Sequence, residues 1–492
     1  MSGPACPTAP AAVAPQSFLN CLGYILTPQV WKQAQQAAGR RRALRWQRQP
    51  LILVLLVMTW CAGDSLPERF ETARAFYVAC HQRRRRPGKT FAGFEKALGK
   101  MPLRVLRAVA GAVRQRLAAV FAERFRVDGW IPLGCDGSRL ACSRSAELEQ
   151  RLGVRAKKRR RRKKKIGPAG RPGPKPELGP GLPENPKKPK AGPDAPQIWV
   201  TAVVHLGLGL LWSWRLGKGT ASERVHLRQL VATLPRGALL VADAGYVGYA
   251  LLNALQAAGL CFLIRLTSRA PLYVPDKSAL KHYCEGLVYY WPQKVQKHDL
   301  PPIPVRLLRI RGDQTDVWLI TNVLEEHRLP RKTAGKFYRW RWRNEGLFRT
   351  YKRTLGKVKL MSRTVAQVHR EAEGSLLATQ LLLDQGALGL KTSAKAPTGT
   401  GLPSARKVLV EIRAEIRNVT GMYLGPRQRQ SYLERLTQAR WPDRRQGSPK
   451  VRRRWPGRRD HKPPGRPTIL KMGTILKDKM AKTLTMAQGQ NC

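Results

Sequence analysis

The chain has 492 residues, of which 91 are Lys or Arg and 31 are Asp or Glu, so its formal net charge is +60. This balance argues against small acidic molecules as sole substrates and favours a polyanion partner, either nucleic acid or an anionic membrane. No apolar run reaches the roughly 18 residues that a membrane span needs, and the N-terminus lacks the basic region of a secretory signal. With 42% apolar residues, the chain can bury a large core.

The cysteines and histidines argue against a zinc protein. Nine scattered cysteines form no CxxC pair, which predicts reduced thiols in a cytosol rather than disulfides or a zinc site. The eight histidines show neither HxxxH nor HExxH spacing, and we interpret His205 and His226 as structural.

Three segments are predicted to be disordered: 1–27, 151–196 and 441–492. Residues 151–196 hold 16 basic and three acidic residues, including nine consecutive basic residues from Lys157 to Lys165, in a Pro/Gly-rich context. The tail 441–492 holds 14 basic and three acidic residues. Neither has enough apolar side chains to offset the entropy of ordering. The other 394 residues still carry +36, so we expect the folded part to bind nucleic acid too.

Residues 28–125 have helical periodicity. The run 51–61 (LILVLLVMTWC) predicts a buried helix, and basic turns are expected at 40–42 and 83–86. A later apolar stripe at steps of three and four predicts an amphipathic helix, formed by Leu103, Leu106, Val109, Val113, Leu117, Val120 and Phe121. We interpret 28–125 as a helical domain that binds DNA ends; a helical bundle with a solvated basic surface is the alternative.

An α/β pattern follows Trp130. Strands are expected at 131–140, 238–242 and 261–266, a hairpin at 198–204 and 210–216, and a helix from Tyr249. The run Thr220-Ala-Ser-Glu223 predicts a capping box that opens a helix to about 234. Residues 268–332 predict a strand-rich insertion, and helices are expected at 337–355, 364–390 and 404–420. The order of elements predicts a mixed sheet with helices.

Three carboxylates stand on separate elements of this unit. Asp136 lies within the first strand, Asp243 ends a buried strand, and Glu345 lies on a basic helix. The carboxyl end of such strands is where α/β sheets place their active sites. Converging carboxylates could hold two Mg²⁺ ions for phosphodiester cleavage. Taken singly, Asp136 and Asp243 could be turn acids, and Glu345 could pair with neighbouring arginines.

The neighbourhood of Glu345 contains a spaced pattern. Tyr338, Arg341, Glu345 and Lys352 follow Y-(2)-R-(3)-E-(6)-K, and at 100° per residue they would share one side of a single helix. A metal-binding carboxylate would then lie beside two cations and a hydroxyl suited to phosphates.

With these motifs the sequence resembles the insertion-sequence DDE transposases that carry the Y-R-E-K signature. The resemblance covers most of the chain, including CDGSRL, GTASERVHL, VADAGYVGY and the Y-R-E-K segment. It implies a ribonuclease H-like catalytic core with a strand-rich insertion, and a metal-binding catalytic triad of Asp136, Asp243 and Glu345. It also implies that Tyr338, Arg341 and Lys352 bind DNA near the cleaved phosphate. The long basic segment 151–196 departs from the family pattern.

We therefore expect an α/β protein with a ribonuclease H-like core, preceded by an all-helical domain. The expected order is 1–27 disordered, 28–125 helical, 126–150 with 197–267 and 333–390 as core, 151–196 as a disordered basic insertion, 268–332 as strand-rich insertion, 391–440 as C-terminal helices, and 441–492 as a disordered tail.

The expected function is DNA transposition with two Mg²⁺ ions, for which Mn²⁺ can substitute. Terminal inverted repeats and target DNA are the expected partners, the protein is expected to dimerise on DNA, and no membrane is involved. The expected location is the bacterial cytoplasm, at the nucleoid. The alternatives are a non-catalytic DNA-binding remnant of an element and a metal-dependent nuclease.

Overall fold

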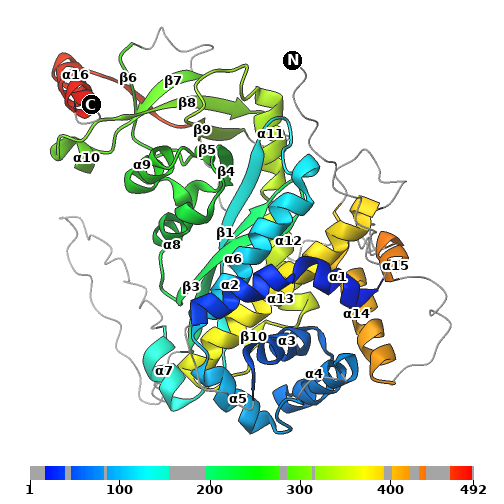
Figure 1. Ribbon diagram of the computed structural model, residues 1–492. Helices are drawn as coiled ribbons and strands as arrows, with labels where there is room; N and C mark the ends of the chain where they lie inside the picture. The colour runs from blue at the N-terminus through cyan, green and yellow to red at the C-terminus, as the bar shows by residue number, and fades with distance from the viewer. Residues whose placement is uncertain are drawn as a thin grey trace, which may run out of the picture.

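The computed structural model describes residues 17–38, 46–81, 86–154, 195–276, 285–312, 316–392, 402–421, 432–438 and 466–489. Figure 1 shows a central sheet with the N-terminal helices packed over its lower half, and a group of strands with α16 at the opposite end. In these ranges no helix has the length and apolarity that crossing a membrane requires. The predicted basic turn at 40–42, residues 83–85 of the one at 83–86, and residues 155–194 of the basic segment lie outside the described residues.

The chain begins with a helical layer, as the periodicity predicts. Side-chain caps begin several of its helices: Ser17, Ser65 and Thr90 accept from backbone N–H groups at the first turns of α1, α4 and α5. The helices described before the sheet are α1 (Phe18–Ile25), α2 (Pro28–Ala38), α3 (Arg48–Trp60), α4 (Leu66–Cys80), α5 (Phe91–Lys100) and α6 (Leu103–Val120).

Two details of this layer bear on the sequence predictions. The expected buried helix is α3, whose residues from Pro50 to Trp60 are buried except for Leu53. The prediction that 1–27 is disordered is wrong for α1, because Phe18, Cys21, Leu22 and Ile25 all pack into the helical core. A helix of eight residues is too short to show a clear helical period in the sequence, and tertiary packing stabilises it.

The sheet is mixed, and its described part has eleven strands in the order β11-β6-β7-β8-β9-β5-β4-β1-β2-β3, with β10 beside β1. The strands are β1 (Ile131–Cys142), β2 (Gln197–His205), β3 (Leu210–Lys218), β4 (Ala238–Ala242), β5 (Cys261–Arg265), β6 (Leu272–Val274), β7 (Gly286–Tyr290), β8 (Ile303–Ile310), β9 (Val317–Thr321), β10 (Lys359–Leu360) and β11 (Ile469–Lys471). A short helix, α7 (Ala146–Leu152), follows β1.

Five neighbouring strands form the expected core. β1, β2 and β3 are antiparallel, whereas β4 and β5 run parallel to β1. The crossover helices α8 (Glu223–Leu230) and α9 (Tyr249–Ala257) connect β3 to β4 and β4 to β5. This order is that of a ribonuclease H-like core, so the expected fold class is confirmed.

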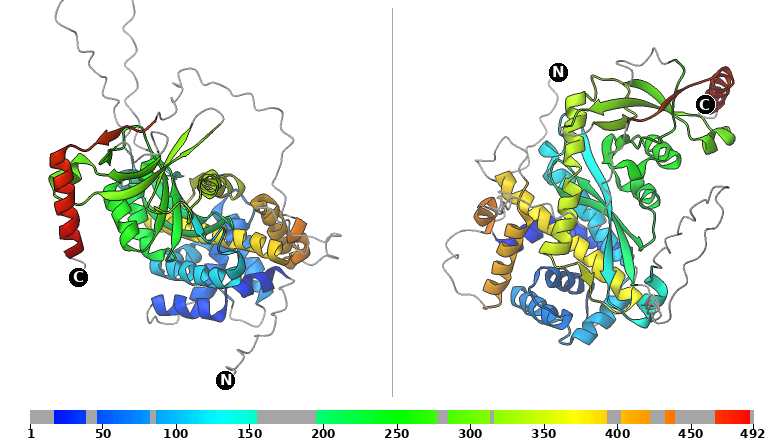
Figure 2. Two further views of the ribbon diagram at one scale, coloured as in Figure 1. Left: turned by 90° about the horizontal axis from the view of Figure 1, so that it is seen from above. Right: turned by 180° about the vertical axis from the view of Figure 1, so that it is seen from behind.

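The two faces of the core are covered by different helices. Leu240 and Ala242 pack with α8 and α9, whereas Leu239 and Val241 pack on the opposite face with α11 (Arg331–Trp340), as the alternation of a strand requires. Beside α11, the N-terminal helices and the long α13 (Val365–Thr392) cover β1–β3, which Figure 2 shows from above and behind.

The strand-rich insertion at 268–332 extends this sheet instead of forming a separate unit. β9 pairs with β5, and β8, β7 and β6 continue outward from it. A short helix, α10 (Gln293–Lys297), lies between β7 and β8.

The C-terminal region contains α14 (Ala405–Val419), α15 (Tyr432–Gln438), β11 and α16 (Thr474–Gly489). The prediction that 441–492 is disordered is wrong for β11 and α16. β11 pairs with β6 in parallel, and Met472 is buried against Trp291 and Val295. A three-residue strand that is held by backbone pairing leaves little trace in the sequence.

Both histidines that we interpret as structural have structural partners. The ring nitrogens of His205 lie 2.9 Å from the Phe125 carbonyl and 3.2 Å from the Leu208 N–H. Burial lowers the pKa of His205 to about 4. His226 Nδ1 lies 3.0 Å from Thr201 Oγ1.

Candidate active site

Two of the predicted carboxylates are level with each other on neighbouring parallel strands. Gly134 of β1 pairs with Val241 of β4. Asp136 and Asp243 each lie two residues further on, and adjacent strands are about 4.8 Å apart. The strand register therefore brings these two side chains to one edge, on the same face.

Each of these aspartates is oriented by its own backbone. Asp136 Oδ1 accepts a hydrogen bond of 2.8 Å from the Gly137 N–H. Asp243 Oδ1 accepts one of 2.9 Å from the Ala244 N–H and caps the 3-10 turn Ala244–Tyr246. In each case one carboxylate oxygen is held by the backbone N–H of the next residue.

The predicted single helix over 337–355 is wrong. α11 ends at Trp340, α12 (Arg343–Arg349) begins after two intervening residues, and a π-helical turn spans Thr350–Thr354. Contacts at the break explain the change in direction: the Arg343 guanidinium lies 4.2 Å from the centre of a Trp340 ring and donates to the Leu206 carbonyl. The four signature residues are therefore spread over two helices and a turn.

Glu345 and Lys352 nevertheless reach the first aspartate. Together with Asp136, they line a pocket of about 360 Å³ between β1 and α12. Lys352 Nζ donates to Ser138 Oγ at 2.8 Å. Arg349 and Arg353 also line this pocket, so its rim is strongly basic.

Tyr338 lies near the second aspartate, and Arg341 packs on the ring of Tyr338. Arg341 is only 6% exposed, with its guanidinium carbon 5.5 Å from the Tyr338 ring centre and 4.9 Å from that of Trp342. Arg265 hydrogen-bonds to the Tyr338 side chain, and its Nη1 lies 3.6 Å from Asp243 Oδ1. Burial first, then the Asp243 charge, raise the pKa of Tyr338.

The pKa of Asp136 shows that the three carboxylates influence one another. Burial raises this pKa, and the charges of Glu345 and Asp243 raise it further. The Gly137 N–H and the Arg341 guanidinium act in the opposite direction. Like charges close together favour a bound cation.

A fourth carboxylate, which our sequence analysis assigned to a cap, lies at the same place. The predicted capping box is wrong: Ser222 is the N-cap of α8 and makes no side-chain cap hydrogen bond. Glu223 instead faces the aspartates. Burial, Asp136 and Asp243 raise its pKa, and a hydrogen bond with Tyr246 lowers it. This position of Glu223 depends on how α8 packs against the strands, which the sequence alone does not show.

The donor set suits Mg²⁺, which prefers carboxylate oxygens, but it is not gathered at one point. Among the described residues, no three His, Cys, Asp or Glu side chains converge closely enough to hold one metal ion. The ion pair between Arg265 and Asp243 accounts for part of this separation.

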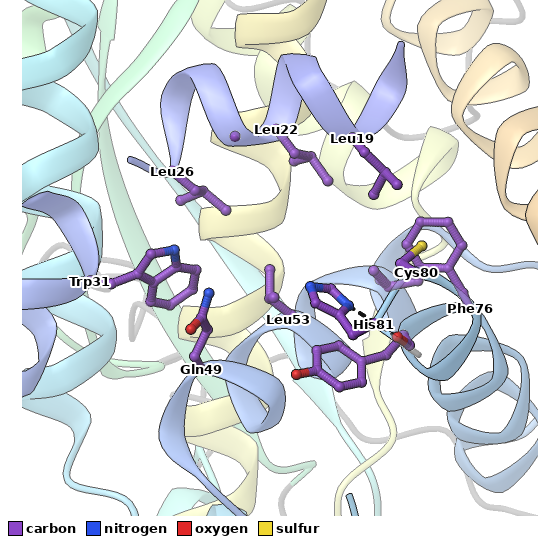
Figure 3. A pocket seen from close by; sticks show the side chains of 12 residues that line it. Leu19, Leu22, Leu26, Trp31, Gln49, Leu53, Phe76, Cys80 and His81 are labelled. Carbon is purple, nitrogen blue, oxygen red and sulfur yellow. Dashed lines mark hydrogen bonds between the residues drawn. The ribbon is translucent and has the colours of Figure 1, made fainter. Parts of the chain in front are cut away.

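A second cavity, of about 290 Å³, lies among the N-terminal helices (Figure 3). Most of its lining side chains are apolar and come from α1, α2, α3 and α4. The described lining residues include no acid. His81 stacks on Tyr77 with ring centres 4.3 Å apart. Burial raises the pKa of Cys80 to about 11, so this cavity lacks the groups that hydrolytic chemistry needs.

Comparison with known proteins finds a similarity for the part of the chain that contains Asp243 and Glu345. Residues 180–381 match the family model of the transposase DDE domain. No curated protein sequence matches the chain. Among solved structures, the cryo-EM structure of the piggyBac transposase synaptic complex with hairpin DNA is similar, with 12% identity, a TM-score of 0.40, and coverage of 88% of this chain and 87% of that one. The chain is therefore similar to the transposase DDE domain over residues 180–381, a segment that contains Asp243 and Glu345 but not Asp136.

Proposed function

We propose that this protein is a DNA transposase that cuts DNA at the ends of its element and joins the freed 3′-hydroxyl to target DNA. One observation carries the proposal: Asp136 on β1 lies level with Asp243, which directly follows β4, and Glu345 lines a pocket with Asp136. Asp243 and Glu345 fall within the segment that is similar to the transposase DDE domain. We assign the catalytic, metal-binding roles to these three residues.

Bound divalent cations, Mg²⁺ or Mn²⁺, would activate the attacking oxygen and stabilise the leaving one. The ligands in this proposal are the carboxylates of Asp136, Asp243 and Glu345. Asp243 pairs with Arg265 in the absence of ligands; it would hold an ion only after leaving Arg265, for which DNA phosphates would be an alternative partner.

Phosphate binding is assigned to Tyr338, Arg341 and Lys352. Within the described residues, Arg341 Nε is buried without a hydrogen-bond partner, and a buried donor of this kind favours an anionic ligand. Lys352 is held by Ser138, two residues from Asp136. Both cations can therefore position the strand whose phosphate faces the carboxylates.

The remaining assignments rest on the distribution of positive charge and on the helical layer at the N-terminal side. We assign recognition of DNA ends to the helices of 28–125, non-specific phosphate binding to the basic segments, and dimerisation to the DNA-bound form. The proposed place of action is the bacterial cytoplasm, at the nucleoid.

The test uses labelled oligonucleotides that carry the element ends, with Mg²⁺, and compares Asp136→Asn, Asp243→Asn and Glu345→Gln with the unaltered protein. Each variant keeps its shape but loses a charged ligand, so cleavage should fall at least 10³-fold while DNA binding stays within about threefold. Glu123→Gln, at an exposed position before β1, should cleave normally. Substantial cleavage by any triad variant would contradict its assignment, and cleavage without joined products would favour a nuclease.

A further inference from the structure

Two arginines outside the Y-R-E-K pattern line the pocket between β1 and α12. Arg349 ends α12 and Arg353 lies in the π-helical turn, and both residues are exposed. They share this pocket of about 360 Å³ with Lys352, so that three cations and two carboxylates line it. The lining is therefore positive overall, and a cleft of this sign attracts anions.

A buried tyrosine anchors the π-helical turn that carries two of these cations. Tyr351 is 1% exposed, and its hydroxyl oxygen lies 2.7 Å from Ser375 Oγ on α13. The Leu355 N–H donates to the Thr350 carbonyl at 3.0 Å, which is the five-residue step of a π turn. Because Tyr351 is fixed in the core, the two cations that follow it in the sequence are held at the pocket, in a backbone form that recurs at functional sites.

The three cations have no acidic partner within the described part of the chain. No ion pair there joins Arg349, Lys352 or Arg353 to an Asp or Glu, and Lys352 donates to the Ser138 hydroxyl instead. A guanidinium group binds phosphate through two parallel hydrogen bonds. The charge and the donors of this pocket are therefore suited to a phosphodiester.

The other arginine that we assign to phosphate binding lies elsewhere. Arg341 is not among the described residues that line this pocket; it packs on the ring of Tyr338, which lies near Asp243. The pocket cations lie beside Asp136 instead. A DNA strand that passes both aspartates therefore meets both groups of cations, and the Y-R-E-K pattern gives no role to Arg349 and Arg353.

We propose that Arg349 and Arg353 bind the phosphate that adjoins the cleaved one, on the α12 side, and so position the strand for reaction. The inference rests on the proposed function and extends it beyond the residues of the Y-R-E-K pattern. The competing explanation is that both are ordinary solvated arginines of a strongly basic protein, which add only non-specific attraction to DNA.

Uncharged methylphosphonates, placed at one phosphate at a time in a duplex that carries the element end, distinguish the two explanations. With the unaltered protein, a methylphosphonate at the adjoining phosphate on the α12 side should lower cleavage about tenfold. Arg349→Ala and Arg353→Ala should each lower cleavage of the normal duplex about tenfold. In either variant the same methylphosphonate should cost less than about a further twofold, because its partner is already missing. The coupling should appear in the affinity for the duplex too, where it requires no cleavage.

Arg236→Ala is the matched control. It removes an exposed arginine before β4, at the end of that strand opposite to Asp243, and should respond to every methylphosphonate as the unaltered protein does. Thermal unfolding establishes that each variant is folded, and the exposed positions predict melting temperatures within about 1 °C of the unaltered protein. If an alanine variant does not fold, Arg349→Lys or Arg353→Lys replaces it; each keeps the charge without the guanidinium fork and should show a smaller coupling.

The possible results separate this inference from the proposed function. If every methylphosphonate lowers cleavage and affinity by the same factor in the Arg349 and Arg353 variants as in Arg236→Ala, the inference alone is overturned. Unchanged cleavage in Asp136→Asn, Asp243→Asn and Glu345→Gln would instead overturn the proposed function.

Discussion

At the scale of single residues, the two basic residues of the Y-R-E-K pattern differ in how much of the fold depends on them. Lys352 reaches Ser138 from the pocket rim, whereas Arg341 is buried between two aromatic rings. Removing Lys352 should therefore affect function alone, and removing Arg341 should affect packing as well.

We expect Lys352→Ala to lower cleavage about 10²-fold while changing overall DNA affinity by less than about threefold, because it positions one phosphate among many contacts. Its melting temperature should stay within about 1 °C. Arg341→Ala should lose both cleavage and stability, and Arg341→Lys should recover more stability than cleavage, since an ammonium group lacks the guanidinium geometry. Cleavage assays, filter binding and thermal melts measure the three quantities. Normal cutting and joining by Lys352→Ala would make Lys352 an ordinary surface residue.

Asp384 on α13 is a second residue with a measurable signature. It is 0% exposed, and neither of its oxygens has a hydrogen-bond partner in the described structure. Burial raises its pKa well above the ordinary value, so the folded protein holds a proton that the unfolded chain releases near pH 4. The free energy of unfolding should therefore fall as pH rises above about 4, by up to about 1.4 kcal/mol per unit, until the folded pKa is passed.

Asp384→Asn removes this titration. We expect it to be more stable than the unaltered protein at pH 8, with a flatter pH dependence between pH 5 and 8. Urea unfolding at each pH measures both. Asp64→Asn, at an exposed position, serves as the control and should leave the slope unchanged. Equal slopes for Asp384→Asn and the unaltered protein would show that Asp384 is ionised in the fold.

At the scale of elements, the contact between β1 and α12 sets the distance from Asp136 to Glu345. A methyl group on Gly134 would lie 2.6 Å from Asn344 Nδ2 and from a Leu206 methyl group. Gly346, by contrast, has nothing within 4 Å of a Cβ, although it also lies on α12.

Gly134→Ala should therefore destabilise the protein by about 1–3 kcal/mol through overpacking, and it should reduce cleavage by moving α12. Gly346→Ala should raise stability by about 0.5–1 kcal/mol, because alanine favours a helix over glycine. Thermal or urea unfolding of the two variants checks the opposite signs. If both variants lost stability, the contact between β1 and α12 would not be the cause of the loss, because Gly346 takes no part in that contact.

At the scale of the whole molecule, the positive charge is spread over segments that differ in structural role. Residues 155–194 contain 15 basic and three acidic residues, and a backbone bridge between Gly153 and Pro196 closes the base of this segment. The ends of the segment are therefore adjacent, so a short turn can replace it without stretching β1 or β2.

Replacing 155–194 by a short Gly-Asn-Gly linker should weaken binding to any DNA and flatten its salt dependence, because fewer counterions are released. Preference for element ends, assigned to the N-terminal helices, should remain. Binding to end and random DNA at several salt concentrations measures this, after circular dichroism has established the fold. Loss of end preference with unchanged affinity for random DNA would mean that the segment reads sequence.

The tail calls for a different deletion. Removing 439–465 should weaken DNA binding and flatten its salt dependence, as the replacement of 155–194 does, because those residues carry much of the tail's charge. Extending the deletion to 489 also removes β11 and exposes the edge of β6, so we expect a lower melting temperature and aggregation. If both deletions melt alike, the pairing of β11 with β6 contributes nothing measurable to stability.

The sequence by itself determined the elements whose signals are local. Charge and apolar periodicity predicted the helical layer, the strand, hairpin and crossover pattern of the core, and the position of Asp243 at a strand end. Strong periods of 2 and 3.6 residues survive in any tertiary context. The resemblance to DDE transposases came from the same local motifs, and the match over 180–381 agrees with it at the level of the domain.

Only the tertiary structure decided what depends on distant contacts. The break after Trp340, the strand β11, the helix α1 and the place of Glu223 have weak or misleading local signals. The run Thr220-Ala-Ser-Glu223 at the start of α8 has the composition of a capping box, yet Glu223 turns toward Tyr246 and the aspartates. The physical reason is that long-range packing and the hydrogen bond with Tyr246 outweigh a local cap hydrogen bond of about 1 kcal/mol.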